Sequence, residues 1–288
     1  MRRSPLLPAV ALLAACLSPT AAAHPRACGY DATVLADSPV AYWRMDGGSR
    51  EPDLSGHGHT GVYAGGRAPA VLPNGERAAD FDGATGYLEV ADHPSLSPAT
   101  TGELTLEAWL RPDVLEFPNT EGSGYVHWLG KGAPGQHEYV ARMYAKTNTE
   151  DRPNRVSGYA FNPSGGLGAG SYFQDALTAG RWIHYVLVIN ARVRTPEYPH
   201  GYTKVYRDGV LRDQDHLVIR DVVITPVDGT APLRVGTRDF GSWFAGAVGK
   251  VAVYGHELSA ARVAAHTAAM PSCARGQSCT ATKRSSEV

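Results

Sequence analysis

The sequence predicts an all-β protein built as a two-sheet antiparallel β-sandwich, and composition gives the first support. The chain of 288 residues contains 32 glycines, 20 prolines and 14 tyrosines, which suits many short strands joined by turns. Runs rich in valine and aromatic residues recur along the chain, as expected of strands. The length allows one large sandwich or two small domains, and either could bury a sizeable core.

The balance of charge restricts the class of partner. Lysine plus arginine (27) nearly equals aspartate plus glutamate (28), so no net field favours nucleic acid or an anionic membrane surface. A neutral partner fits better, and neutral glycans are one such class.

The first 23 residues read as an export signal. Arg2 and Arg3 precede the apolar run Leu6–Leu17, which is too short to span a bilayer, and Ala21–Ala23 supplies a small-residue cleavage site. The sequence therefore predicts a secreted protein. The alternative is a bacterial lipobox that ends at Cys16, which would leave the protein lipid-anchored outside the cytoplasmic membrane. No later run of about 18 apolar residues predicts a membrane span.

After a lead-in at residues 24–38, the domain is expected over residues 39–270. Pro39–Asp46 is the first predicted strand, and Asp53–Gly58 packs turn-forming residues into a tight loop. Asp80–Val90 is predicted as a hairpin-like unit. Glu103–Leu110 alternates leucine and alanine with polar residues, the pattern of a half-buried strand.

The later elements follow the same logic. Trp182–Asn190 is apolar on both faces, which predicts a strand covered on each side. Ala191–Gly201 is expected to be a loop, and Asp208–Gly209 is a two-residue hairpin signal because both residues tolerate positive φ. Pro232–Val263 reads as strand, loop, strand and a short helix capped by Ser259. Residues 271–288 form a polar tail that is predicted to be disordered.

The order of these motifs resembles the laminin-G-like domains of the concanavalin A-like lectin/glucanase superfamily. The matching segments are Tyr42–Asp46, Asp53–Gly61, Phe81–Val90, Leu104–Pro112, Gly180–His184, Tyr206–Gly209 and Pro232–Val263. The resemblance implies two antiparallel sheets in jelly-roll topology, with a short helix near the C-terminus. It implies less about function, because this sandwich carries lectins, adhesion modules and enzymes.

The region Tyr125–Asp175 is the candidate binding site because aromatic residues and arginine gather in it. Flat sugar faces rimmed by hydroxyls need aromatic planes beside hydrogen-bonding side chains. The residues predicted to bind a glycan are Arg142, Tyr144, Tyr159, Tyr172 and His137. Arg142 and Tyr144 are expected on the exposed face of one strand. The alternative is that these aromatics fill the core or pack as cross-strand pairs.

No catalytic residue is assigned from the sequence. Glycoside hydrolases use two carboxyl groups about 5 to 9.5 Å apart, whereas Glu103 and Glu107 are about 13 Å apart along one strand. His184 lies in an apolar strand and is predicted to be a satisfied core histidine. We therefore predict a carbohydrate-binding, lectin-like module that recognises a glycan or a matrix component. The alternatives are a polysaccharide lyase or hydrolase that uses Arg142 with His137 or His184, and a structural adhesion module.

A weak calcium site is predicted at Asp46 and Asp53, because carboxylates and loop carbonyls suit this ion. The resemblance also implies an acidic segment in the penultimate strand, but Gly249 and Lys250 stand where the family has acids. A charged lysine opposes a divalent ion if it points toward the site. Calorimetric titration should therefore find weak calcium binding or none, and a submicromolar affinity would contradict this expectation.

Cysteines predict a disulfide between the chain ends. Export places the protein in an oxidising compartment, and the ends of such domains usually lie close together. We expect Cys28 to pair with Cys273 or Cys279. Non-reducing peptide mapping should find that link, whereas a Cys273–Cys279 link alone, or three free thiols, would exclude it.

Overall fold

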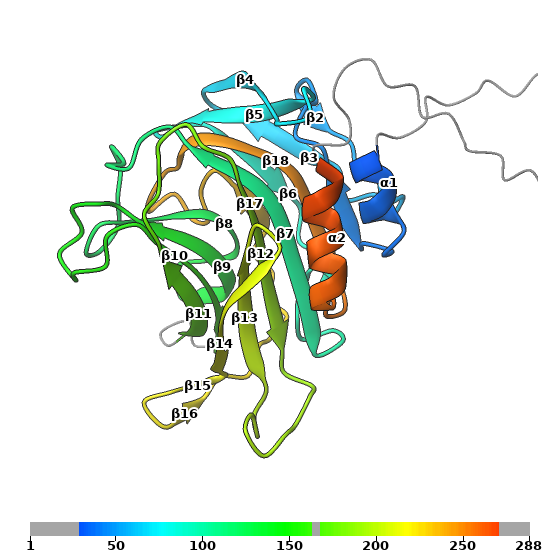
Figure 1. Cartoon of the computed structure of the whole chain (residues 1–288), viewed down its shortest axis with the longest axis vertical. Helices are drawn as coiled ribbons and strands as arrows, with labels where there is room; N and C mark the ends of the chain where they lie inside the picture. Colours follow the sequence, from blue (N-terminus) through cyan, green and yellow to red (C-terminus); the bar gives the residue numbers. More distant parts are fainter. Residues whose placement is uncertain (1–28, 163–167, 271–288) are drawn as a thin grey trace, which may run out of the picture.

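The computed structural model describes residues 29–162 and 168–270, which form a β-sandwich of two antiparallel sheets with two helices on one side (Figure 1). The predicted all-β sandwich with a short C-terminal helix is therefore confirmed. No helix in these ranges is long and apolar enough to cross a membrane. The predicted signal peptide, the lipobox, the cysteines, residues 24–28 of the lead-in and the polar tail lie outside the described residues.

Sheet 1 has eight strands in the order β14-β13-β12-β7-β18-β5-β4, and β1 also pairs with β18. Their bounds are β1 Ala41–Trp43, β4 Arg67–Val71, β5 Arg77–Asp82, β7 Glu103–Pro112, β12 Ile183–Asn190, β13 Tyr202–Arg207, β14 Val210–His216 and β18 Ala245–Tyr254. The long strands β7, β12 and β18 form its centre.

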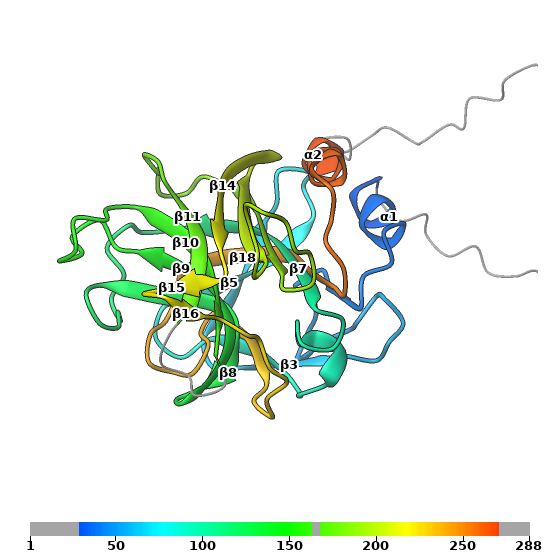
Figure 2. The same cartoon turned by 90° about the horizontal axis from the view of Figure 1, so that it is seen from below.

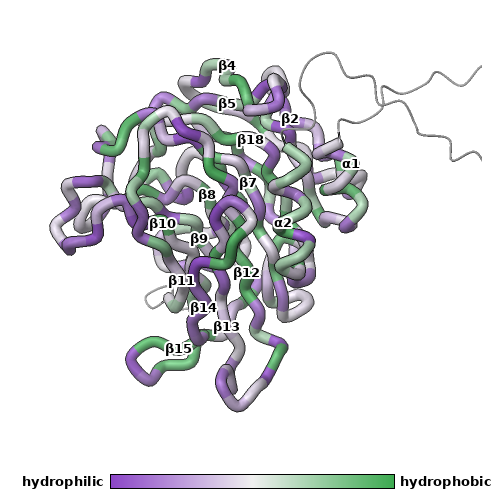
Figure 3. The backbone as a smooth tube through the Cα atoms, viewed as in Figure 1, coloured by the Kyte–Doolittle hydropathy of each residue, from purple (hydrophilic) through white to green (hydrophobic). Residues whose placement is uncertain are grey.

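Sheet 2 has eight strands in the order β11-β10-β9-β8-β17-β6-β3-β2. Their bounds are β2 Arg50–Glu51, β3 Gly61–Ala64, β6 Tyr87–Val90, β8 Tyr125–Ala133, β9 Gln136–Tyr144, β10 Arg155–Phe161, β11 Gly168–Gln174 and β17 Leu233–Val235. A small hairpin of β15 (Val218–Ile219) and β16 (Val222–Val223) and the 3-10 turn η1 (Pro94–Leu96) complete the β part. The hairpin is largely hydrophobic and projects from the sandwich (Figure 3).

The main core lies between the two sheets and consists of the inward-facing residues of both. Trp128 of sheet 2 meets Tyr185 of sheet 1 edge to face, with ring centroids 5.1 Å apart and ring planes at 82°. Both side chains are fully buried. Large aromatic rings therefore fill the space between the sheets where the strands are longest.

A second hydrophobic layer covers the outer face of sheet 1. Helices α1 (Gly29–Leu35) and α2 (Ala260–Ala269) lie side by side over this face, as Figure 2 shows in a view from below. The predicted cap is confirmed, because the Ser259 hydroxyl accepts a hydrogen bond from the Arg262 N–H. Helix α1 was not predicted from the sequence, which places residues 29–35 in the lead-in.

Two predictions for the strands were wrong. Glu103–Leu110 is buried on both faces, since α1 and α2 cover the side that was expected to meet water. Asp80–Val90 is not a hairpin, because β5 belongs to sheet 1 and β6 to sheet 2. The Asp82 carboxylate holds the crossing turn by accepting hydrogen bonds from the N–H groups of Ala84, Thr85 and Gly86.

Other predictions hold. β12 is buried along its whole length, as expected of a strand covered on each side. Residues 191–201 contain no strand and form a loop. The predicted two-residue turn is confirmed, because Asp208 and Gly209 have φ values of 51° and 84° between β13 and β14.

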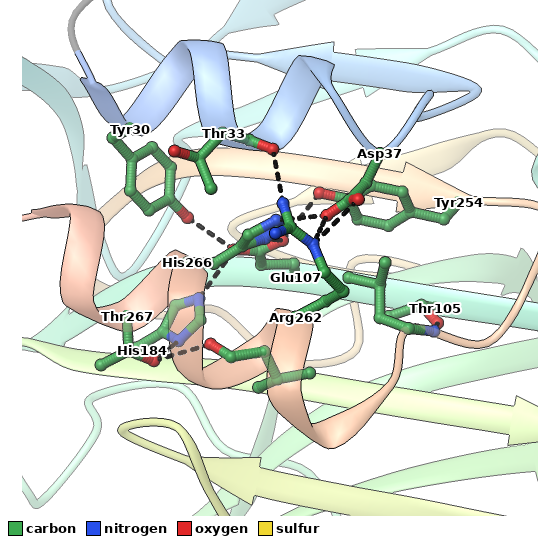
Figure 4. A network of polar contacts seen from close by, with 12 residues as sticks. Tyr30, Thr33, Asp37, Thr105, Glu107, His184, Tyr254, Arg262, His266 and Thr267 are labelled. Atoms are coloured by element: carbon green, nitrogen blue, oxygen red, sulfur yellow. Dashed lines mark hydrogen bonds and ion pairs between the residues drawn. The ribbon is translucent and has the colours of Figure 1, made fainter. Parts of the chain in front are cut away.

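A buried carboxylate joins the helices to sheet 1. Glu107 of β7 is fully buried and accepts hydrogen bonds from the hydroxyls of Tyr30 (2.7 Å) and Tyr254 (2.8 Å). The imidazoles of His184 and His266 each lie 2.8 Å from its oxygens (Figure 4). His184, also 2.6 Å from the Thr267 hydroxyl, is thus the satisfied core histidine that the sequence predicts. Since all four partners and Glu107 are fully buried, this network is structural and closed to a substrate.

The surroundings of His266 favour its positively charged form. Its second ring nitrogen lies 2.7 Å from the Asp37 carboxylate, so both nitrogens face acids. Burial lowers the pKa of His266, but the hydrogen bonds and negative charges of Glu107 and Asp37 outweigh it and raise that pKa above its usual range. Burial raises the pKa of Glu107, whereas the bonds from His184 and His266 bring it well below its usual range.

Replacing His266 should make stability less dependent on pH. A raised folded-state pKa means that the stabilisation by His266 is complete below the unfolded-state pKa of about 6.5 and is lost as pH rises through the folded-state pKa. His266→Gln should lower the free energy of unfolding by about 3 kcal/mol near pH 6, because it breaks a buried ion pair. The decrease should be smaller near pH 9.

Urea denaturation at several pH values measures this difference. His57→Gln is the control, because His57 lies exposed on a loop and should change stability little at any pH. A constant difference between wild type and His266→Gln from acid to alkaline pH would show that His266 is not charged in the folded protein.

Candidate functional site

The outer face of sheet 2 carries a group of aromatic side chains around one arginine, here called the tyrosine–arginine face. Alternation along the strands and the register between them place these residues together, because side chains two residues apart share a face. Arg142 is the Cα partner of His127 in β8 and of Ser157 in β10. The members are Tyr125, His127, Arg142, Tyr144, Tyr159, Phe161 and Tyr172.

Arg142 lies at the centre of this face. Its guanidinium carbon is 4.3 Å from the ring centroid of Tyr159, 4.6 Å from that of Tyr125 and 4.8 Å from that of Tyr144. Its Nε is buried and has no hydrogen-bond partner among the described residues. Within the same residues no carboxylate forms an ion pair with it. The tyrosine rings therefore hold a cation that no acid neutralises.

The prediction that Tyr144 is exposed was wrong. Tyr144 is 2% exposed, and its hydroxyl accepts a hydrogen bond of 3.3 Å from Arg152. It lies under Arg142 and packs on the Tyr125 ring, with centroids 5.3 Å apart. Ala141 and Met143, which alternate with these residues along β9, are in the core.

The other predicted binding residues lie at the edges of the same face. Tyr172 is 39% exposed, and the Arg155 guanidinium stacks 3.6 Å from its ring centroid. His137 packs edge-on against Phe161 at 5.4 Å and borders a cleft of about 310 Å³ between the start of β9 and residues 227–230. All five residues predicted from the sequence are thus brought to one side of sheet 2, and whether they bind a ligand stays a prediction.

Comparison with protein families decides which fold family this is. A model of the "concanavalin A-like lectin/glucanases superfamily" matches residues 82–264, which is most of the described domain. The chain belongs to this superfamily. A comparison with curated proteins gave no match.

Several solved structures have a similar fold. The receptor-binding domain of botulinum neurotoxin type G has a TM-score of 0.55 and 11% identity over 80% of this chain and 51% of that chain. The ligand-binding domain of botulinum neurotoxin serotype D, in complex with N-acetylneuraminic acid, has a TM-score of 0.59 and 12% identity over 83% and 52%. A structure of botulinum neurotoxin type C, whose cell entry is described as dependent on two ganglioside molecules, has a TM-score of 0.59 and 10% identity. The match covers 83% of this chain and 53% of that chain. The chain spans about half the length of these structures, and such low identity shows the fold alone.

Sequence reasoning missed three residues beside the face of this superfamily member: Glu121, Arg238 and Asp239. β17 pairs with β8, so the β17–β18 loop lies against β8 although about a hundred residues separate them in the chain. An isolated bridge between Asn119 and Trp243 fixes the loop before β8 to the same place. The one available signal was the charged pair Arg238–Asp239, which follows Gly236 and Thr237 after β17.

These residues form two histidine–carboxylate pairs. His127 Nδ1 is 3.1 Å from Glu121 Oε2, and His137 Nε2 is 3.3 Å from Asp239 Oδ2, both without the geometry of a hydrogen bond. Burial lowers the pKa of His127 to about 4, so this imidazole is neutral at pH 7. Burial raises the pKa of Asp239, but contact with His137 and the charge of Arg238 outweigh it and bring that pKa below its usual range.

Of the two predicted calcium ligands, Asp53 has another role in the structure. Asp53 Oδ1 accepts hydrogen bonds from the N–H groups of Tyr42 and Ser55, and Oδ2 accepts one from His59. These bonds fold the loop after β1. Among residues 29–162 and 168–270, Asp46 and Asp53 do not belong to a group of three potential metal ligands. Calcium binding there stays a prediction.

Lys250 does not lie free near those acids. Its side chain is fully buried, and Nζ is 2.6 Å from both Asp31 and Glu76. Asp31 also binds the Tyr42 hydroxyl and the Arg44 guanidinium. The lysine that replaces a family acid therefore fills an acidic pocket between sheet 1 and α1.

Proposed function

We propose that the protein binds carbohydrate through the tyrosine–arginine face of sheet 2. The observation that carries this proposal is Arg142, a cation held by three tyrosine rings with no acidic partner in the described structure. Aromatic planes accept the C–H faces of sugars, and a guanidinium binds hydroxyl or carboxylate oxygens through two parallel N–H groups. The outer face of sheet 1, in contrast, is covered by helices and offers no comparable surface.

The same observation favours an acidic sugar within the glycan class. The overall charge balance suggested a neutral partner, but a site responds to its local charge. A uronate or sialate carboxylate would supply the counterion that Arg142 lacks. The complex of the serotype D neurotoxin domain with N-acetylneuraminic acid, an acidic sugar, agrees with this choice at the level of fold.

Export and the location of the glycan belong to the same proposal. A signal peptide over residues 1–23 would place the domain outside the cell, where it would meet surface or matrix glycans. A lipid anchor at Cys16 is the alternative. In both cases the proposed partner is a glycan rather than a nucleic acid, and the protein has no proposed membrane span. Calcium bound at Asp46 and Asp53 would stabilise the loop after β1.

Arg142→Met should weaken binding of acidic oligosaccharides about tenfold or more while keeping the aliphatic stem packed on the tyrosines. The expected loss, about 1.4 kcal/mol or more, is typical of a central charged contact at an interface. Calorimetry with matched acidic and neutral oligosaccharides, chosen from a glycan-array screen, measures it. Affinity for the acidic ligand should also fall as salt is raised.

Arg50→Met is the matched control, because Arg50 is exposed on β2 of the same sheet and outside the face. It should leave binding and melting temperature unchanged. Equal binding by wild type and Arg142→Met, with both folded, would remove the tyrosine–arginine face from the proposal.

Cleavage of a polysaccharide is the second candidate, and the pair of His137 with Asp239 favours it. His137 is 16% exposed and borders the cleft beside β9, so it could reach a substrate proton, whereas His127 is 3% exposed. Incubating each bound glycan with the protein and analysing the products separates this candidate from simple binding.

A further inference from the structure

We propose that Glu121, His127 and Asp239 form a site for a divalent transition-metal ion such as zinc. Glu121 lies before β8, His127 lies within β8, and Asp239 lies in the β17–β18 loop. One ligand atom from each residue lies within 4.8 Å of the others. This spacing allows a single ion to contact all three.

Buried polar atoms without a hydrogen bond point to a missing ligand. His127 is 3% exposed, and its Nδ1 lies 3.1 Å from Oε2 of Glu121, but neither atom makes a hydrogen bond. Buried polar atoms in folded proteins nearly always make at least one. An ion that contacts both the nitrogen and the oxygen would satisfy both.

The strand position and the ring of His127 have contacts of their own. The backbone N–H of His127 donates a hydrogen bond of 3.0 Å to the Ser242 hydroxyl, and its ring packs against the Tyr125 ring, with centroids 5.2 Å apart. A metal would bind the lone pair of the imidazole nitrogen that faces Glu121.

The local charges allow a divalent ion. Glu121 and Asp239 contribute two negative charges, and Arg238, 2.7 Å from Asp239, contributes one positive charge. Arg142, the Cα partner of His127 in β9, adds a second positive charge nearby. These two arginines reduce affinity, but no ion pair within the described residues joins either of them to Glu121.

A second acidic group shows how this protein fills a cation site with its own side chain. Asp92, Glu138 and Asp228 also have metal-ligand spacing. The Lys131 ammonium lies among them, 2.6 Å from Asp92, 3.0 Å from the Gly229 carbonyl and in contact with Glu138. No lysine enters the group of Glu121, His127 and Asp239 in the described structure.

The ligand types select the metal. Imidazole with carboxylates suits zinc, cobalt, nickel or manganese better than calcium, which prefers oxygen alone. Three protein ligands leave a fourth position open, as in catalytic zinc sites. The Tyr125 ring lies 5.2 Å from His127, so this site borders the tyrosine–arginine face.

Zinc chloride titrated into the full chain without glycan tests the proposal by calorimetry, and cobalt chloride adds a visible absorption band. Wild type should bind one equivalent that His127→Gln and Glu121→Gln lose, or bind at least about tenfold more weakly. The deciding quantity is this difference, because cysteines and exposed histidines also take zinc. His93→Gln is the control, since His93 is exposed on another loop.

Two outcomes contradict the site. If both variants bind zinc like wild type, or if His93→Gln alone loses the equivalent, the ion lies elsewhere. Should the buried His127→Gln variant fail to fold, Glu121→Gln decides, because it replaces a carboxylate that is 33% exposed. Since no glycan is present, failure here leaves the proposed carbohydrate binding untouched.

Discussion

The buried carboxylate of Glu107 determines how the helices attach and, through them, which face of the sandwich remains open. An ionised carboxylate in the interior is stable only when donors surround it. Two of its four donors, Tyr30 and His266, come from α1 and α2, so the charge cannot be satisfied unless both helices dock on sheet 1 (Figure 4). Docking closes the outer face of sheet 1. The outer face of sheet 2, which no described helix covers, therefore stays open, and it is the face on which the proposed ligand would bind.

Arg142 differs from the buried lysines of this protein in how its positive charge is balanced. The ammonium groups of Lys131 in sheet 2 and Lys250 in sheet 1 lie fully buried among carboxylates and contribute to the fold. Arg142 has aromatic rings as neighbours and no acid within the described structure. Cation–π contacts stabilise such a group by about 0.5 to 2 kcal/mol each without cancelling its charge. At Arg142, an anionic ligand would supply the negative charge that carboxylates of the protein already supply to the two buried lysines.

The sequence predicts the sandwich well because strand patterns and turn residues are local. The Asp208–Gly209 turn, the buried β12 and the Ser259 cap each depend on neighbours within a few residues. Burial of Glu107 and Tyr144 could not be predicted, since it depends on what covers a strand from elsewhere in the chain. For the same reason the group of Glu121, His127 and Asp239 was missed, because the pairing of β17 with β8 brings together residues that are far apart in sequence.

Rigidity connects the fold to its proposed function. Tyr144 is buried between Arg142 and Arg152, and the tyrosine rings limit the rotamers of Arg142 before any ligand arrives. Binding then costs little side-chain entropy, which for a free arginine is about 0.5 to 1.5 kcal/mol. A metal ion at His127 would add a second fixed positive centre next to Tyr125. Two fixed charges beside flat rings distinguish ligands by the spacing of their anionic groups and hydroxyls, which gives selectivity that one flexible arginine could not provide.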